Sequence, residues 1–364
     1  MIEFPENTRN ILVTGGAGFI GGAVVRRLLV SSSVKIFTLD KMGYASDLSS
    51  VQKVLSGMDH LAADRHEVLK VNLFNEEATI NAVRLADPDL VLHLAAESHV
   101  DRSINSPTTF INSNIIGTFN LLQAVLFHWQ SLPNNRQENF RFHHISTDEV
   151  FGSLGPKGFF SEKTPYAPSS PYSASKAASD HLASSWHHTY GLPVVITNCS
   201  NNYGPWQFPE KLIPIVILKA LSNQPIPLYG DGENVRDWLF VEDHVDALLL
   251  AAIKGRVGST YCIGGEEEKR NIEVVEHICR LLDQERPESS PHSRFILPVN
   301  DRQGHDRRYA IDPYRIKNEL KWKPAHKFDE AIKITVKWYL NNLDWCKTIL
   351  KRSKYDGEEI GLIK

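Results

Sequence analysis

Residues 10–21 of this chain read NILVTGGAGFIG, and they decide its fold. The first five residues form an apolar run typical of a buried strand, and a helical pattern covers 18–30. Between the two, glycines follow the spacing G-x-x-G-x-x-G, at Gly15, Gly18 and Gly21. Glycine adopts positive φ angles and lets backbone N–H groups approach a pyrophosphate at a helix N-terminus. The stretch therefore predicts a strand, a phosphate-binding turn and a helix; the plainer alternative is a tight turn that binds nothing.

An acidic residue after the next strand-like run selects between dinucleotides. Val34–Leu39 reads VKIFTL, and Asp40 follows it directly. A carboxylate in that position accepts a hydrogen bond from a ribose 2′-hydroxyl and repels a 2′-phosphate. The sequence therefore predicts NAD as the cofactor rather than NADP.

Strand-like and helical segments alternate through the first half of the chain. Further apolar runs typical of strands buried on both faces are Leu90–Leu94, Phe140–Ile145 and Val194–Asn198. The amphipathic stretches among these runs are 75–86, 107–129 and 171–190. Alternation of this kind predicts right-handed βαβ crossovers. The expected fold class is α/β, a Rossmann-type doubly wound parallel sheet with a smaller C-terminal substrate-binding α/β domain.

The pattern loosens after residue 201, where prolines break it into short elements and loops. Later helical stretches are 242–253, 271–283 and 328–341. The expected division of the chain is a cofactor-binding domain over 1–200, to which part of 234–262 returns, a mainly substrate-binding domain over 201–345, and a loose charged tail over 346–364. Ligands of such folds bind at the carboxyl ends of the strands, so we expect the second domain to pack there.

The composition argues against several classes of protein. The 364 residues contain 40 Lys and Arg against 43 Asp and Glu, so no basic excess favours nucleic acid or a membrane surface as a partner. No apolar run reaches the roughly 18 residues of a membrane span, and the N-terminus lacks a signal-peptide pattern. Four cysteines without a CxxC pair fit a reducing cytoplasm and predict neither a disulfide scaffold nor a metal site. They are Cys199, Cys262, Cys279 and Cys346.

Two short motifs carry groups suited to acid–base chemistry. Tyr172 and Lys176 form Y-x-x-x-K, which places both side chains on one helix face, where the ammonium favours a tyrosinate base. Thr147, Asp148 and Glu149 follow the strand-like run 140–145, at the edge where ligands bind. Two carboxyls there can divide acid and base roles. The alternatives are a solvated pair on a helix surface and an exposed acidic loop.

Together these segments resemble the extended short-chain dehydrogenase/reductase superfamily and, within it, the dTDP-glucose 4,6-dehydratases. The resemblance covers roughly residues 10–340. Beside the widespread TGGAGFIG at 14–21, the narrower motifs are LAAESHVDRS at 94–103, STDEVFG at 146–152, PYSASKAASDHL at 171–182, TNCSNNYGPWQFPEKLIP at 197–214, LYGDGENVRDWLFVEDH at 228–244 and GHDRRYAID at 304–312. The Thr-Asp-Glu triplet discriminates, because the related 4-epimerases lack the adjacent acid pair.

The resemblance implies an NAD-dependent hydro-lyase that converts dTDP-glucose to dTDP-4-dehydro-6-deoxyglucose, for deoxysugar (rhamnose, for example) biosynthesis. Tyr172 would take the C4 hydroxyl proton as hydride leaves C4 for NAD⁺. Glu149 would then remove the C5 proton while Asp148 protonates the departing C6 hydroxyl, after which hydride returns to C6. Thr147 and Lys176 complete the implied catalytic set.

The resemblance also implies binding residues, with the domain after 201 holding the nucleotide sugar. Besides the glycines and Asp40, the implied cofactor contacts are Phe19, Ile20, Lys41, Met42, Gly43, Asn72, Leu73, Leu94, Ala95, Ala96, Glu97, Ser98, Ser113, Tyr172, Lys176 and Asn202. The implied substrate contacts are Ser98, Thr147, Asn201, Lys211, Leu212, Pro227, Leu228, Tyr229, Arg236, Asn271, Asp301 and His305. Arg236 and Lys211 suit a diphosphate, which needs positive charge.

Three residues depart from the family pattern. Asn72 stands where Asp is frequent, Gly43 where Thr is usual, and Phe151 where Tyr is usual. An amide still bonds adenine through its donor and acceptor groups, whereas the other two changes each remove a hydroxyl. None of the three falls in the implied catalytic set.

Several alternatives stay open from the sequence. A 4-epimerase or decarboxylase would use the same C4 oxidation, and a silent NAD-sensing scaffold would use the same cofactor fold. The nucleobase of the substrate (dTDP, UDP or CDP) is open as well. In this superfamily, helices such as 107–129 and 171–190 pair across a dimer, so the resemblance implies a homodimer; burial of these helices within one subunit is the alternative.

Overall fold

The computed structural model describes residues 4–5 and 8–353 of the chain. Its centre is a seven-stranded sheet in the order β10-β6-β5-β4-β1-β2-β3, in which every neighbouring pair is parallel. The strands are β1 (Asn10–Thr14), β2 (Lys35–Asp40), β3 (His66–Lys70), β4 (Leu90–His93), β5 (Arg141–Thr147), β6 (Val194–Cys199) and β10 (Thr260–Ile263). The predicted doubly wound parallel sheet is confirmed.

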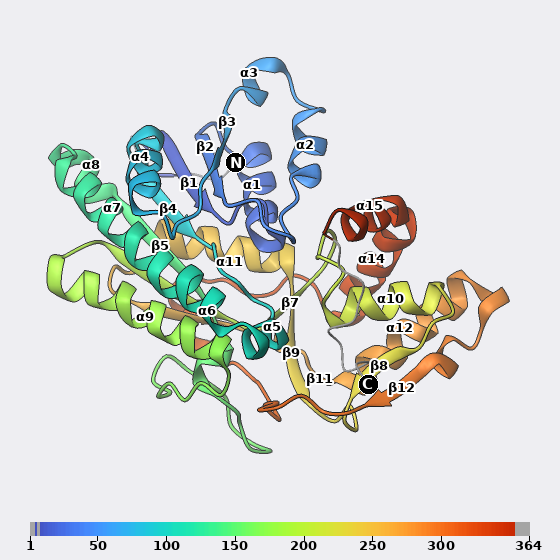
Figure 1. Ribbon diagram of the computed structural model, residues 1–364. Coiled ribbons are helices and arrows are strands. Elements are labelled where there is room, and N and C mark those ends of the chain that lie inside the picture. Colours follow the sequence, from blue (N-terminus) through green and yellow to red (C-terminus); the bar gives the residue numbers. More distant parts are fainter. Residues whose placement is uncertain (1–3, 6–7, 354–364) are drawn as a thin grey trace.

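Helices cover both faces of this sheet (Figure 1). In β1, Ile11 and Val13 point into one apolar cluster and Leu12 into the other, because successive strand residues face opposite sides. The first cluster holds residues of α1 (Phe19–Ser31), α2 (Ser49–Leu55) and α11 (Val241–Lys254). The second cluster holds residues of α4 (Glu76–Ala86), α7 (Gly117–Ser131) and α9 (Pro171–Tyr190). Burial on both sides explains the continuous apolar runs in the strands.

The stretch 107–131 is one long helical segment. It comprises α6 (Pro107–Phe110), a π-helical turn (Ile111–Ile116) and α7. By length and composition alone this segment is able to cross a membrane, which the count of consecutive apolar residues did not reveal. More than half of its most apolar window is buried inside the protein, as in a core helix of a soluble protein, and α7 packs against α4 and α9.

The second lobe lies at the carboxyl ends of the large sheet (Figure 1). Its strands are β7 (Asn201–Tyr203), β9 (Val235–Phe240) and β11 (Glu268–Arg270) in one sheet, and β8 (Ile226–Tyr229) with β12 (Ile296–Val299) in another. Its helices are α10 (Leu212–Leu221), α12 (Asn271–Glu285), α14 (Phe328–Asn341) and α15 (Leu343–Ser353), whereas α13 (Tyr314–Glu319) packs against β10 of the large sheet. The remaining short helices are α3 (His60–Ala63), α5 (Val100–Asn105) and α8 (Asn134–Asn139). The chain visits the large lobe again through α11 and β10, and once more through α13, before it finishes in the second lobe.

In the second half, one helix was not predicted and one prediction was wrong. The prolines after residue 201 do not prevent a helix over Leu212–Leu221, because Pro214 lies in its first turn, where a missing N–H removes no helical bond. The stretch from residue 346 was expected to be a loose tail, yet α15 continues to Ser353 and buries Cys346 and Ile349. The rest of that expected tail, 354–364, lies outside the described residues.

Candidate active site

A cavity of about 410 Å³ lies between the large sheet and the second lobe. Its wall contains all five predicted catalytic residues and every predicted cofactor residue except Met42. It also contains the predicted substrate residues Ser98, Thr147, Asn201, Lys211 and Leu212. Residues from many separate segments therefore meet at one site, as expected where parallel strands end together.

The glycine turn permits an approach that no other residue allows. Gly15 has a φ of +71°, and a Cβ there would lie 2.8 Å from the Cα of Ala95. A Cβ on Gly21 would lie 2.1 Å from the carbonyl oxygen of Gly15. Helix α1 begins at Phe19 with no acidic residue in its first turn, so its positive end is left for an anion. The geometry fits the pyrophosphate of a dinucleotide.

Asp40 is buried at the end of β2 and held in one orientation. Its Oδ1 accepts hydrogen bonds of 2.8 Å from the backbone N–H of Met42 and from the hydroxyl of Ser46. Its Oδ2 accepts one of 3.1 Å from the N–H of Ala17 in the glycine turn. Met42, predicted as a cofactor contact, is absent from the cavity wall; its backbone, at a φ of +58°, orients Asp40 instead.

Tyr172 and Lys176 lie in the first two turns of α9. The helix starts with a capping box, in which the hydroxyls of Ser170 and Ser173 each accept a 3.0 Å bond from the other residue's N–H. The Lys176 ammonium donates a 2.9 Å bond to the carbonyl of Ile145, at the end of β5. The cap and this bond position both side chains beside the strand that carries the acid pair.

The tyrosinate that Lys176 is predicted to favour is opposed by the burial of Tyr172. Burial, followed by the charge of Glu149, raises the pKa of Tyr172 well above its ordinary value. Burial also lowers the pKa of Lys176, whose ammonium is engaged by Ile145. Spacing along a helix shows that two side chains share a face, but it does not show how strongly burial shifts the pKa of each.

The acid pair occupies the end of β5 and the short helical turn that follows it. The Thr147 hydroxyl donates to Oδ1 of Asp148 and accepts from the N–H of Glu149, each at 3.3 Å. Oδ2 of Asp148 is buried without a hydrogen-bond partner among the described residues. An unpartnered buried oxygen in the cavity wall is suited to meeting a polar group of a ligand.

The two carboxyls differ in their electrostatic surroundings. Burial, then the charge of Glu149, raises the pKa of Asp148 well above its ordinary value. Burial also raises the pKa of Glu149, but the cations of Arg302, Arg236 and Lys211 act in the opposite direction. Asp148 therefore retains its proton more readily, whereas Glu149 is nearer to three positive charges. Divergent environments of this kind assign one acid and one base.

Comparison with known proteins decides the family. The model of the family described as GDP-mannose 4,6 dehydratase matches residues 12–335. The chain is 53% identical to the dTDP-glucose 4,6-dehydratase of Xanthomonas campestris pv. campestris (strain B100) over 352 residues, which cover 96% of this chain and 98% of that protein. The chain belongs to the dTDP-glucose 4,6-dehydratase family.

Solved structures agree with this assignment. The structure of dTDP-glucose 4,6-dehydratase from Bacillus anthracis str. Ames in complex with NAD is 42% identical, with a TM-score of 0.80, and the match covers 94% of this chain and 99% of that one. UDP-glucose 4-epimerase from Thermus thermophilus, also in complex with NAD, shares the fold at a TM-score of 0.78 but only 27% identity, over 91% of this chain and 99% of that one. The family is NAD-dependent, as predicted.

The other predicted substrate residues lie outside the cavity wall, which does not include Pro227, Leu228, Tyr229, Arg236, Asn271, Asp301 and His305. Arg236 is buried near the acid pair, stacks on Tyr309 at 4.2 Å and donates to the carbonyl of Asp306 at 3.0 Å. The side chain of Leu228 packs in the core of the second lobe, which leaves only its backbone for a nucleotide.

Tyr229 and His305 form a separate polar group in the second lobe. The hydroxyl of Tyr229 donates to Asp101 at 3.1 Å, and Nδ1 of His305 lies 2.6 Å from Asp301. The rings of Tyr229 and His305 meet edge to face with centroids 6.0 Å apart. These residues lie together in the second lobe and are not part of the cavity wall.

The sequence reasoning missed several residues of the wall. Tyr44 reaches across to Glu210, with its hydroxyl 2.9 and 3.1 Å from the two carboxylate oxygens. Gln207, Phe208 and Glu210 fall inside the stretch 197–214 that carried the resemblance, which was the available signal.

Asp180, outside the wall, was also missed, and it supports helix α9. Asp180 lies one turn beyond Lys176 on α9, fully buried, and accepts bonds from the Tyr166 hydroxyl at 2.9 Å and the Asn198 amide at 3.1 Å. The Asn198 amide also donates to the carbonyl of Thr147 at 3.1 Å. The sequence signal for Asp180 was its spacing of four residues from Lys176, within the same motif.

The departures from the family pattern stay clear of the acid pair. Phe151 packs against Phe160 and Tyr166, with ring centroids 5.2 and 5.3 Å away, in a small core of its own. Asn72 accepts a 3.1 Å bond from the N–H of Phe74 through its Oδ1 and lines the cavity. In the described part of the chain, no three His, Cys, Asp or Glu side chains gather as a metal site requires.

The raised pKa of Asp148 predicts a stability that depends on pH. A carboxyl whose pKa is raised by folding adds stability below its unfolded value, near 3.8, and loses that stability as the pH rises through the folded value. Asp148→Asn removes this loss, so the variant should melt higher than the wild type at pH 8, by about 2 °C or more, with the gap closing toward pH 4. Thermal unfolding of both proteins from pH 4 to 8 measures this difference in melting temperature.

Asp180→Asn is the matched control. Burial alone would raise the pKa of Asp180, but its bond to His144 and nearby positive charge lower it. This variant should therefore be less stable than the wild type at pH 8, with the difference fading in acid. Equal behaviour of the two variants would contradict the assignment of Asp148 as the protonated acid.

Proposed function

We propose that this protein converts dTDP-glucose to dTDP-4-dehydro-6-deoxyglucose, with NAD as a resident cofactor. The observation that carries the proposal is the acid pair: Asp148 and Glu149 line the same cavity as Tyr172, and burial raises the pKa of both, but three cations oppose the rise at Glu149. Oxidation at C4 requires one base, and the elimination of water across C5 and C6 requires an acid and a base. A 4-epimerase has no use for the pair.

The cavity suits NAD at its glycine-turn end. The close approach at Gly21 leaves room for phosphate, and Asp40 suits a ribose hydroxyl rather than a 2′-phosphate. When bound, NAD⁺ supplies a hydride acceptor for C4 and, once reduced, a hydride donor for C6. Among the residues, we propose that Lys41, Gly43, Asn72 and Leu73 surround the adenosine half.

The protein groups handle the protons. Tyr172, in its phenolate form, takes the proton of the C4 hydroxyl and becomes a phenol, and Lys176 keeps positive charge beside the phenolate before that transfer. The C4 ketone acidifies the C5 hydrogen; Glu149 removes that hydrogen as a proton, while Asp148 delivers its own proton to the C6 hydroxyl, which leaves as water. Protonation at C5 and hydride return at C6 complete the product, so the net change is the loss of one water.

The second lobe supplies positive charge for the nucleotide diphosphate. Lys211 lies at the mouth of the cavity, with its ammonium 2.9 Å from the carbonyl of Ser98. The charges of Arg236 and Arg302 oppose the rise that burial causes in the pKa of Glu149. We propose that the large lobe binds NAD and the second lobe the nucleotide sugar, with Tyr229 and His305 at its nucleobase end.

Incubation with dTDP-, UDP- and CDP-glucose tests the proposed function. With the purified protein, mass spectrometry should find a product lighter by one water from dTDP-glucose, and far less of it from the other two. A product of unchanged mass would indicate epimerisation, and no turnover of any substrate would contradict an enzymatic role altogether.

Isotope exchange separates the roles of the acid pair. In deuterated water, Glu149→Gln should still form NADH from bound NAD but incorporate deuterium at C5 at least about 100-fold more slowly than the wild type. Asp148→Asn should keep part of the C5 exchange and suppress loss of the C6 oxygen. Single-turnover absorbance of NADH and mass spectrometry of the sugar follow both steps.

Tyr172→Phe is the control for this experiment, because it should block NADH formation and every later step. If Glu149→Gln exchanges C5 as fast as the wild type and still eliminates water, Glu149 is not the base and the assignment of the pair is wrong.

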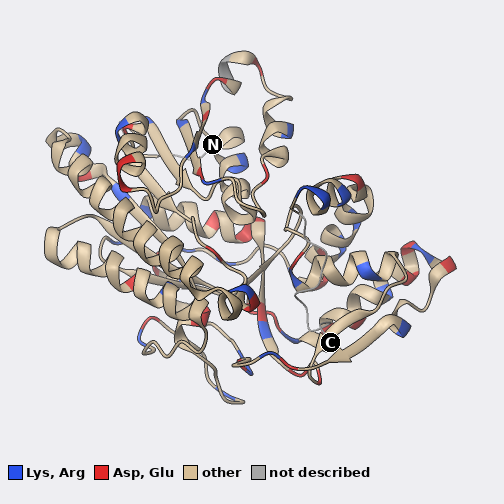
Figure 2. Ribbon diagram, in the orientation of Figure 1, with Lys and Arg blue, Asp and Glu red and all other residues tan. Residues whose placement is uncertain are grey.

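We further propose that the protein is a cytoplasmic homodimer. Helix α7 contains no charged residue, and Figure 2 shows few charges along α7 and α9. Phe119 and Phe127 of α7 are 38% and 61% exposed, which an outward apolar face of a dimer would cover. The four cysteines are all free thiols, which fits a reducing compartment. Analytical ultracentrifugation should give twice the 41.1 kDa of one chain.

A further inference from the structure

The loop 41–48, between β2 and α2, closes one side of the cavity at its glycine-turn end. Gly43, Tyr44, Ala45 and Ser46 contribute to the same wall as the glycine turn and Asp40. The hydroxyl of Ser46 donates to Asp40, and the N–H of Asp47 donates a 2.7 Å bond to the carbonyl of Ala17. The loop is therefore bonded directly to both groups that suit the cofactor.

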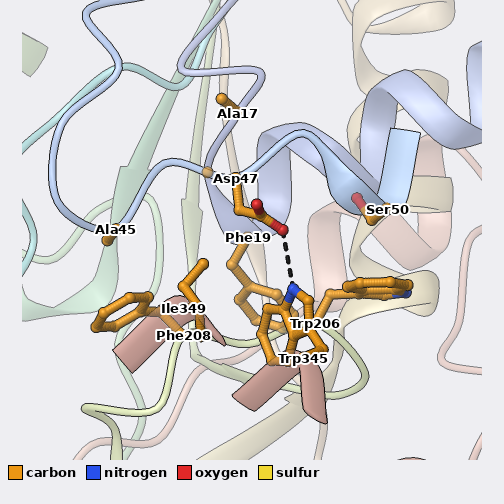
Figure 3. A pocket seen from close by; sticks show the side chains of 10 residues that line it. Ala17, Phe19, Ala45, Asp47, Ser50, Trp206, Phe208, Trp345 and Ile349 are labelled. Atoms are coloured by element: carbon orange, nitrogen blue, oxygen red, sulfur yellow. Dashed lines mark hydrogen bonds between the residues drawn. The ribbon is translucent and has the colours of Figure 1, made fainter. Parts of the chain in front are cut away.

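The C-terminal helix α15 is fastened to this loop (Figure 3). The indole N–H of Trp345 donates a 2.9 Å bond to Oδ2 of Asp47, and the guanidinium of Arg352 donates to Oδ1 at 3.1 Å. Arg352 also donates to the backbone carbonyl of Ser46. The Asp47 side chain is only 11% exposed, so the hydrogen bonds to both of its oxygens are largely shielded from solvent.

Helix α15 itself belongs to the second lobe. Trp345 packs against Trp206 and Trp338, with ring centroids 5.3 and 5.2 Å away, and Cys346 is buried in the second lobe's core. Below the Asp47 bond, the buried Ile349 meets Phe19 and Phe208 around a small hollow (Figure 3). Movement of the loop away from the cavity therefore requires it to separate from the second lobe.

The other half of the loop is fastened to the second lobe as well. Tyr44 bonds Glu210 and packs edge to face on Phe208, at 5.5 Å between ring centroids. The guanidinium of Arg102 lies 3.7 Å from the centre of the Tyr44 ring. Tyr44 thus holds the first half of the loop, and the contacts of α15 hold the second half, where Asp47 bonds the glycine turn.

We propose that α15 latches loop 41–48 over the bound cofactor, and that Asp47, Trp345 and Arg352 are positioning residues that set how slowly NAD leaves. The proposal rests on the proposed function, in which hydride leaves C4 and returns to C6. If the reduced cofactor left between these two steps, the hydride could not return to C6 and the reaction would stop. For the adenosine end to leave past the loop, the three bonds from α15 must open. The Arg352 guanidinium also offsets the charge of the Asp47 carboxylate, which lies beside the pyrophosphate turn, and the Trp345 N–H orients that carboxylate.

Exchange of bound NAD against radiolabelled NAD tests the latch. Trp345→Phe keeps the ring and removes its N–H, and Arg352→Gln removes the charge; the variants are made singly and together. A hydrogen bond to a charged partner is worth roughly a tenfold change in an equilibrium or rate, so the double variant should release NAD at least about tenfold faster than the wild type. Turnover of dTDP-glucose at saturating NAD should stay near the wild-type value.

Two controls match the chemistry of these changes. Trp338→Phe alters the same tryptophan cluster without touching Asp47, and Lys351→Gln removes a positive charge from an exposed position of the same helix. Both should exchange NAD at the wild-type rate. Melting temperatures show whether each variant is folded; Arg352 is half exposed, so its single variant keeps the test valid if the double variant does not fold.

The latch would be overturned if the folded double variant exchanges NAD at the wild-type rate. If the double variant does not fold, wild-type exchange in both Arg352→Gln and Trp345→Phe would overturn it. Equal acceleration in the controls would overturn it too, because general packing of α15 rather than its bonds to Asp47 would then hold the loop. If the wild type neither retains NAD nor dehydrates dTDP-glucose, the proposed function itself has failed, and the latch with it.

Discussion

The contact between Gly15 and Ala95 is the constraint on which the site depends. A Cβ on Gly15 would lie 2.8 Å from the backbone of Ala95, so the turns after β1 and β4 touch at a distance that only glycine allows. Beneath the contact, His93 bridges the hydroxyls of Thr14 and Thr118 at 2.7 and 2.9 Å, which holds β1 and β4 to α7. The glycine turn and the residues after β4, which meet at this point, both line the cavity.

The acid pair illustrates how a site of this kind conflicts with stability. Buried carboxyls cost free energy unless they are protonated or paired, and Asp148 has one oxygen without a partner among the described residues. Asp180, equally buried, is instead surrounded by His144, Tyr166 and Asn198. The contrast within one lobe separates a carboxylate that supports the framework from a carboxyl left available for chemistry.

Regular elements with strong local signals could be predicted from the sequence. The helix over 171–190 was predicted with its observed bounds because Ser170 and Pro171 start it and Gly191, at a φ of +75°, ends it. Strand β3 was missed, since HEVLK is a half-exposed edge strand without a clear apolar run. Helix α15 was missed because its charged residues dominate the pattern, although Trp345, Cys346 and Ile349 give it one apolar face.

The predicted catalytic residues and all the predicted cofactor residues but Met42 lie in the cavity wall, but most of the predicted substrate residues and the energetics of the site do not follow the sequence prediction. Motifs near the glycine turn, β5 and α9 placed their residues correctly because each follows a strand end or lies on one helix face. The protonation of Tyr172 and the burial of Leu228 depend on packing between distant segments, which spacing along the chain does not contain. The link from Asp47 to α15 spans about 300 residues and was not visible before the fold.

The central claim is that one cavity carries out oxidation, elimination and reduction on a cofactor that does not leave. Its most direct measurement uses dTDP-glucose deuterated at C4, mixed with an equal amount of ¹³C-labelled substrate and incubated in ordinary water. The account predicts that deuterium moves to C6 of the same molecule and does not enter the ¹³C-labelled product. Deuterium lost to water, or shared between the two products, would contradict it.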